Sequence, residues 1–442
     1  MKLSKCRGLL YCIVISAFVL CACQSQKGTD ETNVGIFDIS KIESAPLSEP
    51  QQEDQHIVIS DSFNSTDGSV EFIFDISQSI SNANVPVVQV QPHFLTEEDV
   101  KKVATALWGD ADYYEARPLL NAEYSVDEIR AKIERWAEYS SSTALYELYG
   151  RQQDNVEDLV KSFIKEYTIK CETASDKSPK HEAEWQFRKA SYYDRTEDKI
   201  NAADLVLDND EIAVELLSNG MPYRLVAFTR NKSDFKLNYI SAYLYDGISP
   251  NMIDERIFKS KLCRTSAPSD QQISEAKQTA SSMLEEMGLG EWYIDNAQVE
   301  TKYYGDIPEY SIRITATPVF NTANVIRQPQ LSNLKRDDVF ASNYYLTDAE
   351  FIFSPNGQLI RFEMYSPVDV EKVIVDNVKT LEMLEQFECA KNILALSEYR
   401  DYLLSQDLIE ELEKTNKESL ICKVEISDFE YGLTRIKAPN ED

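Results

Sequence analysis

The chain has 442 residues, of which 75 are Asp or Glu and 45 are Lys or Arg, and its formal net charge is −30. A nucleic-acid backbone requires a basic surface, so this acid excess argues against nucleic acid as a partner. The length suits about two domains, and a hydrophobic content of 43% is typical of a globular chain. With only 3 His residues, His-rich metal chemistry is nearly excluded.

The N-terminus has the features of a lipoprotein signal peptide. Three cationic side chains and no acid lie in residues 1–7, and an apolar run follows over residues 9–20, which is too short to span a membrane comfortably. The run ends in Leu-Cys-Ala-Cys at residues 20–23, which resembles a bacterial lipobox. This resemblance implies that the Cys23 thiol is diacylated and that the chain is cut between Ala22 and Cys23. An ordinary secretory signal or an uncleaved anchor is the alternative, and either one also places the mature chain outside the cytoplasm.

Residues 23–55 follow the signal peptide of residues 1–22 as a disordered tether. They are rich in Gln, Ser, Thr and acidic residues, and Pro46 and Pro50 oppose regular structure. A flexible coil of this length has a root-mean-square reach of about 30 Å. Loss of residues 1–22 would remove cations only, so the mature chain would be repelled by anionic lipid headgroups. We expect a protein held on the extracytoplasmic face of the cell membrane by its N-terminal lipid, standing away from the bilayer.

Four cysteines remain once the signal peptide and Cys23 are set aside: Cys171, Cys263, Cys389 and Cys422. They are far apart in the sequence and form no C-x-x-C pair, so zinc-ribbon and thioredoxin-like sites lack their spacing. A disulfide between Cys389 and Cys422 is one interpretation, because disulfides form outside the cytoplasm. Four buried free thiols are the other interpretation, and we favour it.

The mature chain is predicted to be α+β, with antiparallel sheets, packed helices and two modules. The first module covers residues 56–268 and opens with strand-like runs at residues 70–76 and 85–90. Residues 96–170 are predicted to be mostly helical, because capping residues precede apolar residues at helical spacing. The apolar period then shortens, which indicates strands over residues 185–245.

Two details of these strands bear on the sheet. Asn219-Gly220 is a favourable pair for the turn of a β-hairpin. Over residues 239–245, the odd-numbered positions hold Tyr and Ser while the even-numbered positions hold Ile, Ala and Leu. We expect these two sets on opposite faces of a strand.

A domain boundary is expected at residues 266–270, Ser-Ala-Pro-Ser-Asp, with a second α+β module over residues 269–442. A helix over residues 273–287 would end at Gly288, and residues 355–357, Pro-Asn-Gly, predict a hairpin turn. Strands are predicted over residues 292–303, 310–320, 344–353, 359–365 and 420–426, with a helix over residues 381–394. A helix followed by antiparallel strands resembles PepSY-like or cystatin-like modules, in which a helix packs across a curved sheet.

Two segments resemble an uncharacterised family of lipoproteins from Gram-positive gut anaerobes, a domain of unknown function. They are residues 85–99, VPVVQVQPHFLTEED, and residues 432–436, GLTRI. With the lipobox, the resemblance would cover nearly the whole mature chain. It implies no catalytic residues, because the family has no established activity. It also implies a further aromatic-rich strand beyond the equivalent of Ala438, whereas this chain ends at Asp442.

No motif of a serine hydrolase, a zinc protease, a phosphate loop or a dinucleotide site occurs in the sequence. His93 is able to act as an acid or base near neutral pH, but no nucleophile is assignable beside it, so we interpret it as a packed structural residue. His56 is expected to be exposed at the end of the tether, and His181 to lie in a solvated loop. We therefore predict no catalytic residue, no metal and no cofactor.

Tyrosine is abundant, with 24 residues and several doublets. Neighbours in a strand face opposite sides, so a doublet places one ring in the core and one ring outward. Outward rings can stack on sugars or grip a peptide. We select Tyr303, Tyr304, Tyr344 and Tyr345 as candidate binding residues, with ordinary sheet packing as the alternative.

Three functions remain open. The first is a non-enzymatic binding or interaction lipoprotein whose partner is an envelope protein or a cell-wall polymer. The second is a PepSY-like regulator that inhibits an envelope hydrolase. The third is a hydrolase with paired carboxylates, which requires a deep pocket with convergent acids. We favour the first, because the sequence has an anchor and a tether but no catalytic motif.

Overall fold

The computed structural model describes fifteen stretches of the chain. They are residues 55–64, 70–80, 86–117, 123–150, 156–177, 180–189, 209–230, 239–244, 253–320, 323–325, 348–365, 367–377, 387–388, 391–392 and 422–426. The chain divides into two compact units. Unit 1 comprises Met1–Val90, Val319–Tyr344 and Val370–Asp442, and unit 2 comprises Gln91–Pro318 and Tyr345–Asp369.

Unit 1 contains a three-stranded sheet in the order β1-β2-β15. β1 (Gln55–Asn64) and β2 (Val70–Ile80) are antiparallel, and β15 (Cys422–Ile426) pairs parallel to β2. Alternate side chains of β2 are buried on one face of this sheet, as the period of a strand requires. The buried cluster consists of Ile59, Phe72, Phe74, Ile76 and Phe387. A separate two-stranded sheet pairs β14 (Val368–Val375) with β3 (Val87–Pro92).

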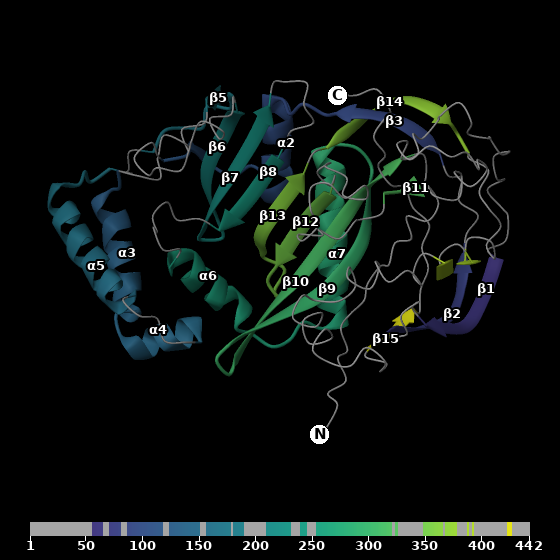
Figure 1. Ribbon diagram of the computed structural model, residues 1–442. Helices are drawn as coiled ribbons and strands as arrows, with labels where there is room; N and C mark the ends of the chain where they lie inside the picture. The colour runs from purple at the N-terminus through teal and green to yellow at the C-terminus, as the bar shows by residue number, and fades with distance from the viewer. Residues whose placement is uncertain are drawn as a thin grey trace, which may run out of the picture. The chain divides into compact units, whose positions relative to one another are not determined.

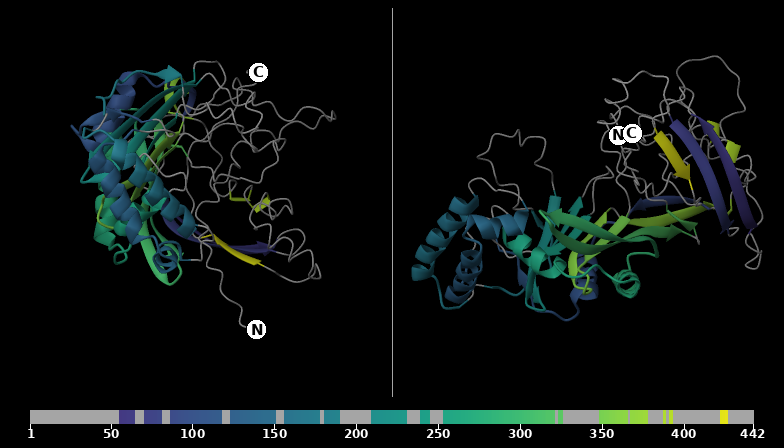
Figure 2. Two further views of the ribbon diagram at one scale, coloured as in Figure 1. Left: turned by 90° about the vertical axis from the view of Figure 1, so that its left-hand side faces the viewer. Right: turned by 90° about the horizontal axis from the view of Figure 1, so that it is seen from below.

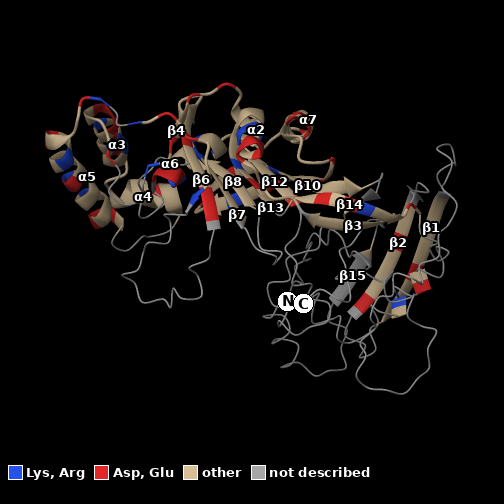
Figure 3. Ribbon diagram, turned by 90° about the horizontal axis from the view of Figure 1, so that it is seen from above, with Lys and Arg blue, Asp and Glu red and all other residues tan. Residues whose placement is uncertain are grey.

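Unit 2 is built on one large antiparallel sheet, most of whose strands are labelled in Figure 1, with β4 labelled in Figure 3. The order along it is β10-β12-β13-β8-β7-β6-β4, with β5 beside β6 and β9 beside β10; the last residues of β10, from Val319, belong to unit 1 and pair there with β11. Every strand pairing for which a register is resolved in this sheet is antiparallel. The strands are β4 (Tyr113–Glu115), β5 (Arg188–Lys189), β6 (Asn209–Ser218), β7 (Met221–Arg230), β8 (Tyr239–Leu244), β9 (Trp292–Tyr304), β10 (Ile307–Phe320), β11 (Ala323–Asn324), β12 (Asp348–Phe353) and β13 (Leu359–Tyr365).

Two helices, α2 (Glu97–Trp108) and α7 (Asp270–Met287), cover one face of this sheet, as Figure 3 shows. Each helix begins at a capping box, formed by Thr96 with Asp99 in α2 and by Ser269 with Gln272 in α7, which satisfies backbone N–H groups that a helix start leaves unpaired. We call the sheet surface beneath them the helix face. Its core includes Val100, Val103, Leu107, Ala280, Leu284 and Met287 from the helices and Ile212, Leu225, Ile240, Ile312, Phe351 and Phe362 from the strands.

Four more helices lie together beside this sheet, as Figures 1 and 2 show. They are α3 (Val126–Glu138), α4 (Ser142–Tyr149), α5 (Val156–Thr173) and α6 (Ile253–Cys263). None of the helices in the described part of the chain is both long enough and apolar enough to cross a membrane.

An aromatic cluster and a buried carboxylate hold these helices together. The Trp136 ring of α3 packs edge-on against Tyr167 of α5, with 5.0 Å between ring centroids. Asp254 of α6 is buried and accepts hydrogen bonds from Arg135 Nε and from the indole Nε1 of Trp136, each at 2.8 Å. Because a buried carboxylate needs such partners, this contact fixes α6 against α3.

The α+β class, the antiparallel sheets and the packed helices are confirmed. The predicted hairpin at Asn219-Gly220 joins β6 to β7, and both residues have positive φ, 51° and 73°, as a tight hairpin turn of the primed type requires. Residues 355–357 make the turn between β12 and β13, where Gly357 has a φ of 78°. Over the described residues 239–244 the alternation is also confirmed, because Ile240, Ala242 and Leu244 are buried while Tyr239 and Tyr243 are half-buried.

The division of the chain differs from the predicted ranges 56–268 and 269–442. Residues 266–270 connect α6 to α7 within unit 2. Strands from both sides of this segment share one sheet, because β8 pairs with β13. That pairing joins strands that are far apart in the sequence, so the composition of a connecting loop does not predict it.

Candidate functional site

The sheet of unit 2 carries polar and aromatic side chains on the surface opposite the helix face. These residues align into three rows across β6, β7, β8, β13 and β12, following the pairing register. The first row is Glu215, Arg224, Tyr243, Arg361 and Ile352; the second is Ala213, Val226, Ser241, Glu363 and Glu350; the third is Glu211, Phe228, Tyr239, Tyr365 and Asp348. We call this surface the polar face.

Three neighbouring rings in the third row form a continuous line, which we call the aromatic strip. The rings of Phe228 and Tyr239 are stacked with 6.3 Å between centroids and 15° between planes. The rings of Tyr239 and Tyr365 are 4.8 Å apart. All three side chains are half-buried, so the strip lies within the sheet surface on three adjacent strands.

Glu363 connects the aromatic strip to a cation. The Tyr239 hydroxyl donates to Glu363 Oε1 at 2.6 Å, and the Arg361 guanidinium pairs with the same oxygen. The Glu363 side chain is only 8% exposed, whereas that of Arg361 is 49% exposed. The polar face therefore presents an accessible guanidinium, held by a buried carboxylate, beside the rings.

The environment keeps these groups in defined protonation states. Burial raises the pKa of Tyr239, and its hydrogen bond to Glu363 raises the pKa further. Burial also raises the pKa of Tyr365. Burial lowers the pKa of Arg361, but the hydrogen bond and charge of Glu363 outweigh burial and the pKa is raised. Near neutral pH the strip therefore offers neutral phenols beside a charged guanidinium.

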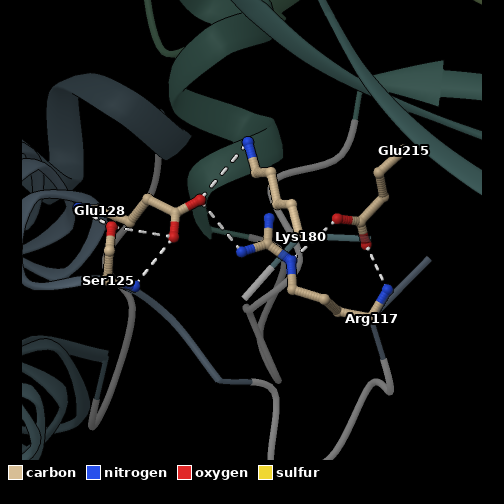
Figure 4. Close-up of polar contacts among 5 residues, drawn as sticks. All are labelled: Arg117, Ser125, Glu128, Lys180 and Glu215. Carbon is tan, nitrogen blue, oxygen red and sulfur yellow. Dashed lines mark hydrogen bonds and ion pairs between the residues drawn. The ribbon is translucent and has the colours of Figure 1, made fainter. Parts of the chain in front are cut away.

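A polar network anchors the end of the first row at β6, as Figure 4 shows. The backbone N–H and Nε of Arg117 donate to the two carboxylate oxygens of Glu215 at 3.1 and 3.0 Å. Arg117 Nη1 also donates to Glu128 at 3.2 Å, and Lys180 Nζ lies 3.5 Å from the same carboxylate. Since Glu128 caps the start of α3 through the Ser125 backbone N–H at 2.9 Å, the network ties that helix to β6.

His93 lies between two carboxylates of unit 2. Its Nδ1 is 2.9 Å from Asp369 and its Nε2 is 3.2 Å from Asp99. Burial raises the pKa of Asp99, but hydrogen bonds from Thr96 and His93 outweigh burial and the pKa is lowered. The backbone N–H of His93 donates to the Pro367 carbonyl at 2.8 Å. These contacts join the start of α2 to Pro367 and to the first residues of β14, which agrees with the structural role predicted for His93.

The predicted tyrosines lie away from the aromatic strip where the structure describes them. Tyr303 is 70% exposed near the end of β9, while Tyr304 is half-buried with the Arg256 guanidinium 3.6 Å from its ring centroid. One ring faces outward and its neighbour packs inward, as predicted for a doublet. Tyr344 and Tyr345 fall outside the described residues, as do Ala22 and Cys23.

The aromatic strip was missed by the sequence analysis, although a signal for it exists. The alternation in residues 239–245 places Tyr239 on the face opposite Ile240 and Ala242. Phe228 and Tyr365 are distant in the sequence, and their place beside Tyr239 depends on which strands pair. His56 and His181 are exposed, as predicted.

Two of the four remaining cysteines are free thiols, Cys171 and Cys263. Burial raises the pKa of Cys263 to about 11, so its thiol is unreactive near neutral pH. The pairing of Cys389 with Cys422 stays a prediction, because Cys389 lies outside the described residues.

The outer surface of α7 carries an open groove of about 420 Å³. It is lined by Ala106, Glu275, Gln278, Thr279, Ser282, Met283 and Glu286. Within the stretches that the structure describes, no three His, Cys, Asp or Glu side chains gather as metal ligands would.

Comparisons with protein-family models, with curated proteins and with solved structures found no match for this chain. The resemblances to the gut-anaerobe lipoprotein family and to PepSY-like modules therefore stay predictions.

Proposed function

We propose that this protein is a non-enzymatic binding module, anchored on the extracytoplasmic face of the cell membrane by lipid on Cys23, that binds a cell-wall glycan. The observation that carries the proposal is the aromatic strip, Phe228, Tyr239 and Tyr365, with the Arg361–Glu363 pair beside it.

The chemistry of the strip suits sugar rings. Aromatic rings provide large, rigid contact surfaces at low conformational cost, and a tyrosine adds a polar end. A guanidinium donates up to five hydrogen bonds, which a carbohydrate's hydroxyl groups can accept. The rings occupy three adjacent strands, and strands are spaced about 4.8 Å apart. A row of this kind supports an extended polymer better than a compact small molecule.

The net charge of the chain disfavours negatively charged polymers as ligands. A chain with a formal charge of −30 repels polyanions over a long range. A neutral glycan pays no such electrostatic penalty. We therefore assign the aromatic strip to neutral sugar units and not to a polyphosphate or an acidic protein.

Sedimentation with insoluble cell-wall polysaccharide tests the proposed ligand. Tyr365→Ala should weaken binding about tenfold, because an aromatic ring of a contact surface contributes about 1–2 kcal/mol. Tyr239→Phe keeps the ring and removes the hydroxyl that donates to Glu363, so it should weaken binding less. Tyr303→Ala is the matched control, since Tyr303 is exposed but lies outside the strip.

Circular dichroism of each variant confirms that the fold persists. The glycan assignment is wrong if the wild-type chain stays in the supernatant, or if Tyr303→Ala weakens sedimentation as much as Tyr365→Ala. Capture of an envelope protein in place of the polysaccharide would assign the face to a protein partner.

The anchor is tested separately on the native protein. Mass spectrometry should find an N-terminus at Cys23 that carries acyl chains, and Cys23→Ala should move the protein from the membrane fraction to the soluble fraction. Two or more acyl chains are required for stable anchoring, since one chain binds only reversibly. An unprocessed Met1 in the native protein would exclude the lipid anchor.

A further inference from the structure

A cluster of cations lies in unit 2 where α6 approaches the hairpin of β9 and β10, next to α4 (Figure 1). Its centre is the buried Glu309 of β10. Arg256 of α6 donates to both oxygens of Glu309, with Nη1 at 2.8 Å and Nη2 at 2.6 Å. Arg264 Nε donates to Glu309 Oε1 at 2.8 Å. A single carboxylate is therefore shared by two guanidinium groups.

Two lysines add to this excess of positive charge. Lys302 is the cross-strand partner of Glu309 in the β9–β10 hairpin, and Lys259 follows Arg256 on α6 after about one turn. Neither lysine forms an ion pair with a carboxylate in the described stretches of the chain. Glu255 faces Lys259 across one helical turn and also lies near Arg361. Arg256, Arg264, Lys259 and Lys302 thus gather around Glu309, in a chain whose overall charge is −30.

The electrostatics of α6 agree with this geometry. Burial lowers the pKa of Lys259, and the charge of Lys302 lowers it further. The thiol of Cys263 is also within electrostatic reach of Arg256, Lys259 and Lys302, and of Glu309. Arg256 itself is 91% buried, and its Nε has no hydrogen-bond partner within the described chain.

We propose that Lys259 and Lys302, beside the Arg256–Glu309 pair, form a binding site for a single oxyanion group, a phosphate or a carboxylate, carried by a small ligand. An oxyanion would compensate the positive charge that Glu309 does not neutralise, and would accept hydrogen bonds from the two ammonium groups. The long-range field of an acidic chain opposes polyanions, which restricts the ligand to one or two such groups. This site does not depend on the aromatic strip, because the full chain can bind an anion here whether or not it binds a glycan.

Thermal unfolding of the full chain in sodium phosphate and in sodium chloride, at equal ionic strength and pH, tests the site. Binding to the folded state alone stabilises it, so phosphate should raise the melting temperature saturably, by about 2 °C or more. Lys302→Gln should abolish this rise, and because Lys302 is exposed the substitution leaves the fold intact. Lys259→Gln should do the same. Lys261→Gln is the matched control, because Lys261 is an exposed lysine of the same helix, and it should retain the rise.

A series in sodium acetate identifies the preferred oxyanion. A saturable rise in either salt that Lys302→Gln removes supports the site, and the salt with the lower half-saturation concentration names the group. A non-specific salt effect on hydration would persist in every variant. A rise that is linear, or that Lys302→Gln leaves unchanged, would overturn the proposal, as would no rise in either salt.

Discussion

The helix face and the polar face of the sheet in unit 2 are made from the same strands, but their side chains are held by different kinds of interaction. On β13, Phe362 faces α2 and α7 and is fully buried, while the next residue, Glu363, faces the other way and holds Arg361 and Tyr239. Apolar contacts have no preferred direction, whereas each polar contact depends on one partner at one distance. Burial of apolar side chains on the helix face therefore supplies most of the stability of unit 2. Residues of the polar face contribute less to stability and are available for binding.

The polar face is also closed differently at its hairpin end. There α6 contributes Arg256 to Glu309 and Tyr304, and the end of α4 approaches the hairpin backbone so closely that two glycines meet. A Cβ atom on Gly150 would lie 2.0 Å from the backbone nitrogen of Gly305. Directional bonds and a backbone contact therefore act here beside a small apolar cluster that includes Phe258 of α6 and Ile352 of β12, whereas α2 and α7 cover the helix face with an extensive apolar layer.

The largest expected loss of stability follows a substitution on the helix face. Phe362→Ala should reduce the free energy of unfolding by about 3–5 kcal/mol, because it removes a fully buried ring and leaves a cavity. Chemical denaturation followed by circular dichroism measures this change. The control is Tyr365→Ala on the polar face of the same strand, which should cost clearly less. Equal costs at the two positions would contradict the division of roles between the faces.

The next effect is at the contact between α4 and the hairpin. Gly150→Ala should cost about 2–4 kcal/mol, because a methyl group meets backbone atoms and φ is +68°. Gly288→Ala is the matched control, since Gly288 ends α7 in the same left-handed conformation with nothing near its Cβ position. It should cost about 1–2 kcal/mol, the conformational penalty alone. If the two substitutions lower the free energy of unfolding equally, the close approach of Gly305 does not contribute to the cost at Gly150.

The local elements of both faces were predictable from sequence, because their signals are local. The helix end at Gly288, the turn at Asn219-Gly220 and the alternation from Tyr239 to Leu244 each involve neighbours in the chain. Helix α6 was not predicted, since its buried side of Asp254 and Arg256 breaks the apolar period by which helices are recognised. These charges are buried only because distant residues pair with them.

The polar face could not be predicted as a unit for the same reason. Its third row joins Phe228, Tyr239 and Tyr365 through pairings of β7 with β8 and of β8 with β13. The first pairing is between consecutive strands, but the second links positions more than one hundred residues apart, and no local pattern specifies it. The tyrosine doublets were chosen by their adjacency in sequence, whereas the strip is defined by adjacency across strands.

A smaller loss of stability is expected when the Glu363 carboxylate of the polar face is replaced. Glu363→Gln should cost about 1–3 kcal/mol, because the charge that Arg361 pairs with is lost and the Tyr239 hydroxyl loses a charged acceptor. A double-mutant cycle with Tyr239→Phe isolates the hydroxyl's share, and a coupling of at least about 0.5 kcal/mol is expected. Strict additivity of the two substitutions would show that this hydrogen bond does not organise the strip.

The smallest effect concerns Glu211 at the end of the aromatic row, and it has the opposite sign. Burial raises the pKa of Glu211 above its ordinary 4.5, an effect that the charge of Arg224 only partly opposes. The folded chain therefore holds this proton more tightly than the unfolded chain does. The contribution of Glu211 to stability is greatest below pH 4.5 and is lost as the pH rises through the pKa of Glu211 in the folded state.

Glu211→Gln should accordingly stabilise the protein by about 0.5 kcal/mol at pH 7 and have little effect near pH 4. Denaturation curves at the two pH values measure this difference. If the glutamine variant is instead less stable at pH 7, attraction to Arg224 outweighs burial, and charge pairing stabilises the polar face even where its carboxylates are buried.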